Sequence, residues 1–118
     1  MENVNIVCLT DKHYRYVRSM DIHFLYLGQR FVWDSEKAFV NARKHGVSFE
    51  LACQVFFDPL IRIEDASTGE EQRDAAIGLT EDWTLLFVVH LLREGDSIRI
   101  ISARPATARE RRDYEDCE

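Results

Sequence analysis

Residues 31–58 most constrain the fold, because local signals mark both ends of two consecutive helices. Asp34 and Ser48 are residue types that cap a helix N-terminus by accepting a backbone hydrogen bond. Gly46 lies between them and can adopt the left-handed conformation that ends many helices. Pro59 ends the second helix, since the residue before a proline is pushed out of helical space. The apolar stripe of the second helix comprises Phe49, Ala52, Cys53 and Phe56. The sequence therefore predicts two helices that meet at a corner.

The remaining chain is dominated by β-prone segments. Two such runs flank Gly28 within residues 20–33 and predict a hairpin. Further strands are expected over residues 60–65, 73–79, 84–92 and 97–104. The first should be half-buried, and the strand at 84–92 should be central and buried on both faces. Thr107 and Glu110 match a capping box, which predicts a helix ending near Asp116. This order indicates an α+β fold: an N-terminal hairpin, a two-helix corner packed on an antiparallel meander, and a C-terminal helix.

The length of 118 residues suits one domain. Residues 1–19 lack a periodic apolar face, so we expect an N-terminal extension there, with disorder as one alternative, and a single domain over residues 20–118. The three cysteines are odd in number and lack metal-ligand spacing, which favours a reducing cytoplasm. The longest apolar run, residues 85–92, is too short to span a bilayer, so no membrane contact is expected.

Charge is distributed unevenly along the chain. The net charge of −6 argues against a nucleic-acid binder when it is taken as one number. However, residues 59–83 hold seven carboxylates against two arginines, whereas residues 97–112 hold five arginines against one glutamate. Local patches decide where a phosphate can bind, so the arginine-rich segment is a candidate RNA surface. The alternative is a solvated helix face whose arginines pair with neighbouring carboxylates.

The sequence contains none of the familiar nucleotide-binding, metalloprotease or serine-hydrolase motifs. Its four histidines fall in four different segments, so we expect no metal site and no cofactor. Arginines, lysines, a histidine and a tyrosine instead suit cleavage of RNA by its own 2′-hydroxyl. That reaction needs a proton acceptor, cations for the developing phosphorane charge, and a proton donor for the 5′-oxygen.

Each candidate residue has a structural alternative. Lys44 and His45 lie where cations stabilise a helix C-terminus, and that role alone could explain them. Arg99 and Arg104 have opposite parity on a strand, so only a bulge or a strand end near Ser102 would bring them to one face. Tyr114 shares a helix face with Arg111 and could instead pack on the sheet. His90 is interpreted as a core histidine with catalysis as the alternative, and Trp33 and Trp83 as core or edge packing with base stacking as the alternative.

Two motifs resemble the BrnT family of ribonuclease toxins from type II toxin–antitoxin pairs. The first is F-x-W-D-x-x-K-A from Phe31, followed by K-H-G-V-S-F-E from Lys44. The second is I-R-I-I-S-A-R over residues 98–104, followed by E-R at 110–111 and Y-E at 114–115. The resemblance implies a RelE-like fold, an RNA substrate, inhibition of translation, and a ribbon-helix-helix antitoxin of the BrnA type in a hetero-oligomer.

These observations lead to two hypotheses of different classes. The first is a metal-independent endoribonuclease toxin that promotes attack of the 2′-hydroxyl on the phosphate. The second is a catalytically silent module that only binds a partner. The candidate catalytic residues are Arg99, His45, Lys44, Arg104 and Tyr114, and the candidate RNA-binding residues are Arg109, Arg111 and Arg112.

Overall fold

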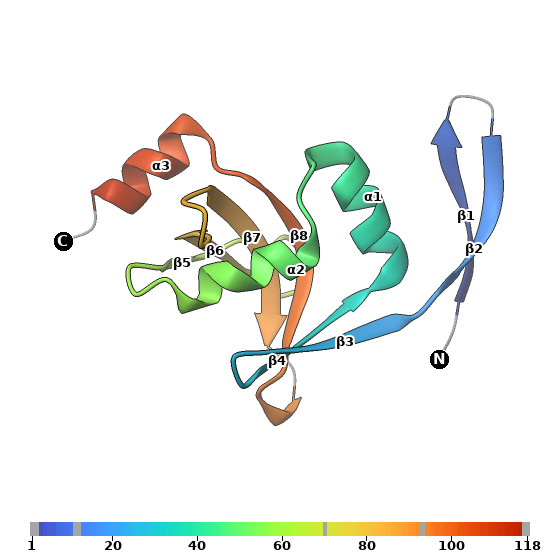
Figure 1. The fold of residues 1–118 in the computed structure, drawn as a ribbon, viewed down its shortest axis with the longest axis horizontal. Helices are drawn as coiled ribbons and strands as arrows, with labels where there is room; N and C mark the ends of the chain where they lie inside the picture. Colours follow the sequence, from blue (N-terminus) through green and yellow to red (C-terminus); the bar gives the residue numbers. More distant parts are fainter. Residues whose placement is uncertain (1–2, 11–12, 70, 93, 117–118) are drawn as a thin grey trace.

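The structure is a computed structural model that describes residues 3–10, 13–69, 71–92 and 94–116. Eight strands and three α-helices are assigned in this part of the chain, together with two short 3₁₀ segments (Figure 1). In order they are β1 (Asn3–Thr10), β2 (His13–Ser19), β3 (Asp21–Tyr26), β4 (Gln29–Asp34), α1 (Ser35–His45), α2 (Phe49–Ala52), η1 (Cys53–Phe57), β5 (Arg62–Asp65), β6 (Asp74–Leu79), β7 (Leu85–Leu92), η2 (Glu94–Asp96), β8 (Ile98–Pro105) and α3 (Ala108–Glu115). The α+β class is therefore confirmed.

The main sheet has six strands in the order β3-β4-β8-β7-β6-β5. Strands β5 to β8 form the expected antiparallel meander, and β3 and β4 form the expected hairpin. The prediction of an antiparallel sheet is wrong at one pairing, because β4 and β8 pair in parallel through Phe31 with Ile98 and Val32 with Arg99. The long connection from β4 through the helices and the meander allows this parallel pairing, which a tight turn would not.

The predicted caps of the first helix are confirmed. Asp34 accepts a hydrogen bond from the backbone N–H of Lys37 at 2.9 Å. Gly46 has φ 70°, and its N–H donates to the carbonyl of Ala42. Both caps use only neighbouring residues, which explains why the sequence alone marked the ends of α1.

The second predicted helix is wrong in type beyond its first turn. Ser48 caps it as expected, but the α-helix ends at Ala52 and continues as the 3₁₀ segment η1. Phe49, Ala52 and Val55 recur every third residue and are all fully buried, which matches the three residues per turn of a 3₁₀-helix. Phe56 is only half-buried.

The core lies between α2–η1 and one face of the main sheet. It includes Trp33, Phe49, Val88 and Ile100. Gly78 of β6 lets η1 approach closely, since a Cβ there would lie 3.0 Å from both the Cβ and the carbonyl oxygen of Val55. A smaller cluster on another part of the sheet packs beneath α3 and includes Ile77, Leu85 and Tyr114.

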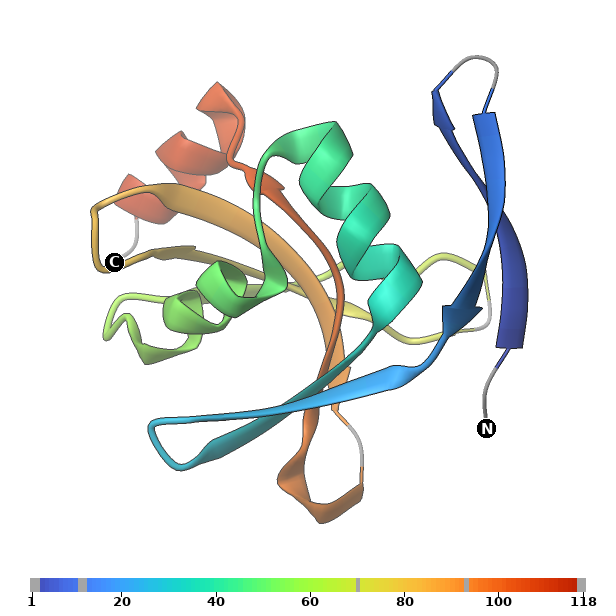
Figure 2. The same ribbon diagram turned by 45° about the vertical axis from the view of Figure 1, so that its right-hand side comes forward.

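Two peripheral segments differ from the sequence patterns. Residues 1–19 offered no trusted periodicity, yet β1 and β2 pair as a separate antiparallel sheet (Figures 1 and 2). Whether these residues form a dispensable extension stays a prediction. The strand expected at residues 60–65 is present as β5, but its half-burial is wrong: all four residues are exposed, because β5 is the outermost strand of the sheet.

Candidate functional site

An irregularity in β8 brings its two arginines to one face of the sheet. Ser102 pairs with Val89, but Ile100 pairs with the next residue of β7, so Ile101 is an extra residue in the ladder. Such a bulge reverses the side-chain alternation beyond it. Because Arg104 pairs with Phe87 and Arg99 with Leu91, both arginines face away from the side of the buried Leu86, Val88 and His90. The bulge near Ser102 that would bring Arg99 and Arg104 to one face is therefore present.

Helix α1 covers the open edge of β8 next to the bulge (Figure 2). The amide Nδ2 of Asn41 donates to the carbonyls of Ala103 at 2.8 Å and Val47 at 3.0 Å. Its Oδ1 accepts a hydrogen bond from the N–H of Ala103 at 3.1 Å. Asn41 thus replaces the strand that would otherwise pair with this edge, and it fixes the position of α1 against β8.

A pocket of about 270 Å³ lies between α1 and the bulge. Lys37, Lys44 and His45 line it from the helix, and Ser102 lines it from the strand. The remaining lining residues are Glu36, Val40, Asn41 and Ile101. The pocket therefore unites two of the predicted catalytic residues, Lys44 and His45, with the strand that carries Arg99 and Arg104.

An acidic residue of the neighbouring β3–β4 hairpin orients the side chain of Arg99. One of its terminal nitrogens donates to Asp21 at the start of β3, with an N–O distance of 2.9 Å. Its side chain is 19% exposed. The hydrogen bond from Arg99 lowers the pKa of the Asp21 carboxyl, so this ion pair persists at neutral pH. Only one nitrogen of Arg99 bonds to a described residue, which leaves N–H groups for an anion.

Arg104 is held more completely. Its two terminal nitrogens donate to the two carboxylate oxygens of Glu110 at 2.8 Å each, and its guanidinium lies 4.2 Å from the centre of the Phe87 ring. Burial raises the pKa of Glu110, but the hydrogen bonds from Arg104 and from the backbone of Thr107 outweigh burial and lower it. The confirmed capping box of α3 therefore also fixes Arg104.

The third group of candidates lies on α3 and does not reach the pocket. Tyr114 is buried, and its hydroxyl donates to the carboxylate of Asp58 at 2.5 Å. Arg111 is exposed and pairs with Glu115 at 3.8 Å, so Tyr114 and Arg111 do not share an environment. Arg109 and Arg112 are exposed. The structure thus brings together Lys44, His45 and the β8 segment, and it places the α3 residues elsewhere.

Two further structural alternatives are confirmed and one is wrong. His90 is a core histidine: it is buried, its Nδ1 lies 3.2 Å from the carbonyl of Val88, and burial lowers its pKa. Trp33 is a core residue with 2% exposure. Trp83 was expected to be core or edge packing, but it is 79% exposed in a turn.

Sequence reasoning missed three residues of the site. Asp21 and Arg99 are 78 residues apart, and no local signal pairs them. Asn41 looked like an ordinary helix residue, although a buried asparagine inside a helix commonly has distant partners. Lys37 was noted only as part of the first motif.

No group of three or more His, Cys, Asp or Glu side chains within the described ranges could hold a metal ion. Across those same residues, the helices are too short or too polar to cross a bilayer.

Together these features define an α+β domain with a cationic pocket between its first helix and its sheet. A family model described as "Ribonuclease toxin, BrnT, of type II toxin-antitoxin system" matches residues 33–110, and the chain belongs to this family. The resemblance drawn from the two motifs is thereby confirmed. Membership implies, at the level of the family, a ribonuclease toxin with an antitoxin partner. No curated protein matches the chain.

Proposed function

We propose that this protein is a metal-independent endoribonuclease toxin that inhibits translation, and that RNA binds at the pocket between α1 and β8. The observation that supports this proposal is the bulge at Ile101. Arg99, Ser102 and Arg104 share one face of β8 because of it, and Ser102 also lines the pocket with Lys44 and His45. A cationic concavity with a histidine at its wall is the arrangement that phosphodiester cleavage needs.

The proposed reaction uses only groups of the RNA and of this chain. The 2′-oxygen of the RNA attacks the adjacent phosphorus, and the bond from phosphorus to the 5′-oxygen breaks. The 2′-hydroxyl loses a proton and the leaving 5′-oxygen gains one; His45 carries out one of these two transfers, and water carries out the other. Lys44 and Arg99 stabilise the extra negative charge on the phosphoryl oxygens. The products are a 2′,3′-cyclic phosphate and a free 5′-hydroxyl. Arg104 positions the face, and Arg109, Arg111 and Arg112 on α3 attract more distant phosphates.

The decisive experiment is cleavage of naked RNA by the purified protein in EDTA. We expect a 2′,3′-cyclic phosphate at the new end. Arg99→Ala should lower the rate about 100- to 1,000-fold, by analogy with the loss of an oxyanion donor. Arg99→Lys should also be slow, because it retains the charge but loses the planar fork. A matched control is Arg62→Ala, which removes an exposed arginine from β5 at the other side of the sheet.

The role of His45 can be separated from helix capping in the same preparations. If the imidazole transfers a proton, His45→Ala lowers the rate and flattens its pH dependence. If it acts only at the C-terminus of α1, the variant loses up to about 1 kcal/mol of stability and cleaves normally. Wild-type cleavage by a folded Arg99→Ala protein would refute the proposed site.

A second function is favoured by the ion pairs themselves. Arg99 and Arg104 already have carboxylate partners, as expected of a stable surface that docks another protein. On this alternative the protein is a catalytically silent module of a toxin–antitoxin-like complex. It would bind its partner with the same affinity in EDTA and leave RNA uncut at every protein concentration.

The expected partner is a ribbon-helix-helix antitoxin of the BrnA type. Its acidic side chains would meet the arginine face, and the association rate would fall as salt rises. Co-expression with a short neighbouring open reading frame that encodes a ribbon-helix-helix protein tests this: that protein should copurify and relieve growth arrest. Harmless expression of the protein alone, with nothing copurifying, would contradict it.

A further inference from the structure

The turn between β6 and β7 presents Trp83 on a rigid base. The backbone N–H of Thr80 donates to the carbonyl of Thr84 at 2.9 Å, and the N–H of Trp83 donates to the carbonyl of Thr80 at 3.0 Å. Asp82 accepts hydrogen bonds from the hydroxyls of Thr80 and Thr84. Trp83 itself has φ 67°, a left-handed conformation that side chains rarely adopt, and is 79% exposed. Trp83 thus combines a strained backbone conformation with a large apolar side chain that is exposed to solvent.

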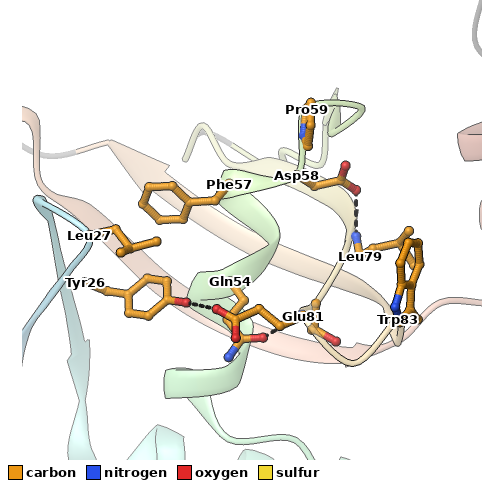
Figure 3. Close-up of a pocket in the computed structure, with 10 residues that line it drawn as sticks. Tyr26, Leu27, Gln54, Phe57, Asp58, Pro59, Leu79, Glu81 and Trp83 are labelled. Carbon is orange, nitrogen blue, oxygen red and sulfur yellow. Dashed lines mark hydrogen bonds between the residues drawn. The ribbon is translucent and has the colours of Figure 1, made fainter.

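Leu27 repeats this combination at the tip of the β3–β4 hairpin. It has φ 51° and is 68% exposed. Leu27 and Trp83 line the same pocket of about 270 Å³, together with Phe57, which is 40% exposed. Figure 3 shows Leu27 and Phe57 on one side of this pocket and Trp83 on the other. Strained backbone at two exposed apolar residues around one cavity points to binding, since folding alone does not require it.

The charges around this pocket have one sign. Asp58 and Glu81 line it, Asp82 lies in the adjoining turn, and no lysine or arginine is among its described lining residues. Hydrogen bonds from Thr80 and Thr84 lower the pKa of Asp82, so that carboxylate stays ionised. Glu81 accepts a hydrogen bond from Tyr26, and its own N–H donates to Gln54 at 2.9 Å. The rim therefore suits a cationic ligand and is preorganised to receive it.

We propose that this pocket docks a segment of the antitoxin that inserts one apolar side chain between Leu27, Phe57 and Trp83 and places a lysine or arginine beside Glu81. The inference rests on the antitoxin partnership proposed above. The docking pocket and the pocket between α1 and β8 have no lining residue in common. Anchoring of the antitoxin is therefore separate from blocking of the catalytic face, and one antitoxin chain can do both.

The two tryptophans of the chain provide a direct test, because Trp33 is 2% exposed and Trp83 is 79% exposed. Iodide should quench Trp83 in the free protein and lose access to it when an antitoxin that copurifies with this protein is added. An antitoxin without tryptophan, made by substitution to phenylalanine where necessary, keeps the signal specific. The emission of Trp83 should also shift to shorter wavelength as it leaves water.

Trp83→Gly separates binding from folding. Glycine adopts a positive φ without strain, so this variant should melt at the wild-type temperature or above. Its affinity for the antitoxin should fall about 30-fold or more, as expected for a buried aromatic anchor. The control Ile63→Thr removes a comparable exposed apolar residue from β5 and should bind normally.

A charge reversal tests the cationic contact. Glu81→Lys should weaken the complex and reduce the salt dependence of its affinity, whereas Glu64→Lys makes the same change in net charge on β5 and should do neither. Cleavage of free RNA by Trp83→Gly should proceed at the wild-type rate while the antitoxin no longer inhibits it fully. A complex in which iodide still quenches Trp83 would overturn the docking site without touching the ribonuclease proposal.

The remaining outcomes are also distinct. If the wild-type protein binds the antitoxin and protects Trp83 but never cuts RNA, the docking site stands and the ribonuclease proposal fails. If sedimentation shows a dimer of the free protein that Trp83→Gly dissociates, the occupant is a second copy of this chain, and the proposal of an antitoxin segment is overturned.

Discussion

Replacing Asn41 with alanine should weaken the attachment of α1 to β8 while the folded structure keeps its packing. Asn41 makes three hydrogen bonds to backbone groups, one as acceptor and two as donor, and is only 7% exposed. At about 1 kcal/mol for each bond, the loss is roughly 3 kcal/mol, because Ala103 is fully buried and water cannot replace the amide. For a domain of this size, that corresponds to a melting temperature lower by about 12 °C.

Urea denaturation followed by circular dichroism gives the free energy directly. The dependence of that free energy on urea should not change, since the surface exposed on unfolding is the same. Val40→Ala on the same helix removes exposed apolar surface and no hydrogen bond, so it should alter stability by less than about 0.5 kcal/mol. If the free energy of unfolding of Asn41→Ala lies within about 1 kcal/mol of the wild-type value, the three hydrogen bonds do not stabilise the contact between α1 and β8.

Asn41→Asp sharpens the test. The new carboxylate still accepts from the N–H of Ala103 but turns a second oxygen toward the carbonyls of Val47 and Ala103, where the amide had donated. It should therefore be less stable than Asn41→Ala at neutral pH. Acid should narrow this difference, because a protonated carboxyl can again donate to one carbonyl. Equal stability of the two variants from acid to neutral pH would show that the donor side of Asn41 contributes nothing.

Three further predictions concern other parts of the fold. Gly78→Ala should lower stability by about 1–3 kcal/mol in urea denaturation, since its Cβ would lie 3.0 Å from atoms of η1. Tyr114→Phe should cost about 1–2 kcal/mol at pH 7 and less in acid. Burial raises the pKa of Asp58, but the hydrogen bonds from Tyr114 and from backbone N–H groups outweigh burial and lower it. The stability linked to that pKa is therefore present above the ordinary carboxyl range and lost as pH falls through the lowered value. A chain starting at Met20 should melt within a few degrees of the full protein, because β1 and β2 form a sheet of their own; a large drop in calorimetry would contradict this.

Local chemistry explains the parts of the fold that the sequence predicted. The caps at Asp34, Gly46, Ser48 and Thr107 each depend on residues within four positions. The local sequence is therefore enough to predict these helix ends. The meander was predictable for the same reason, since its strands follow one another through short connections. The parallel contact between β4 and β8 was not, because it joins residues 67 apart, such as Phe31 and Ile98.

Some residues of the candidate site could likewise be predicted from local sequence, whereas others depend on the pairing of distant strands. Lys44, His45 and Arg99 were accessible from residue type and motif, and the need for a bulge near Ser102 followed from strand parity. Whether β8 contains that bulge depends on its register with β7, which no local signal sets. Asp21 became part of the site only through pairing of the hairpin with the far end of the meander. Local pattern therefore finds chemical groups, and the sheet register decides which of them meet.

The two arginines of β8 have different capacities for a phosphate. Both terminal nitrogens of Arg104 donate to Glu110, one of them also lies 3.2 Å from the carbonyl of Pro105, and Phe87 covers the guanidinium. A phosphate would have to displace an ideal bidentate carboxylate to bind there. Arg99 gives one terminal nitrogen to Asp21, whose side chain is 51% exposed and can move toward water. Arg99 can therefore bind an anion while its carboxylate partner still orients it, whereas Arg104 stiffens the strand on which that binding depends.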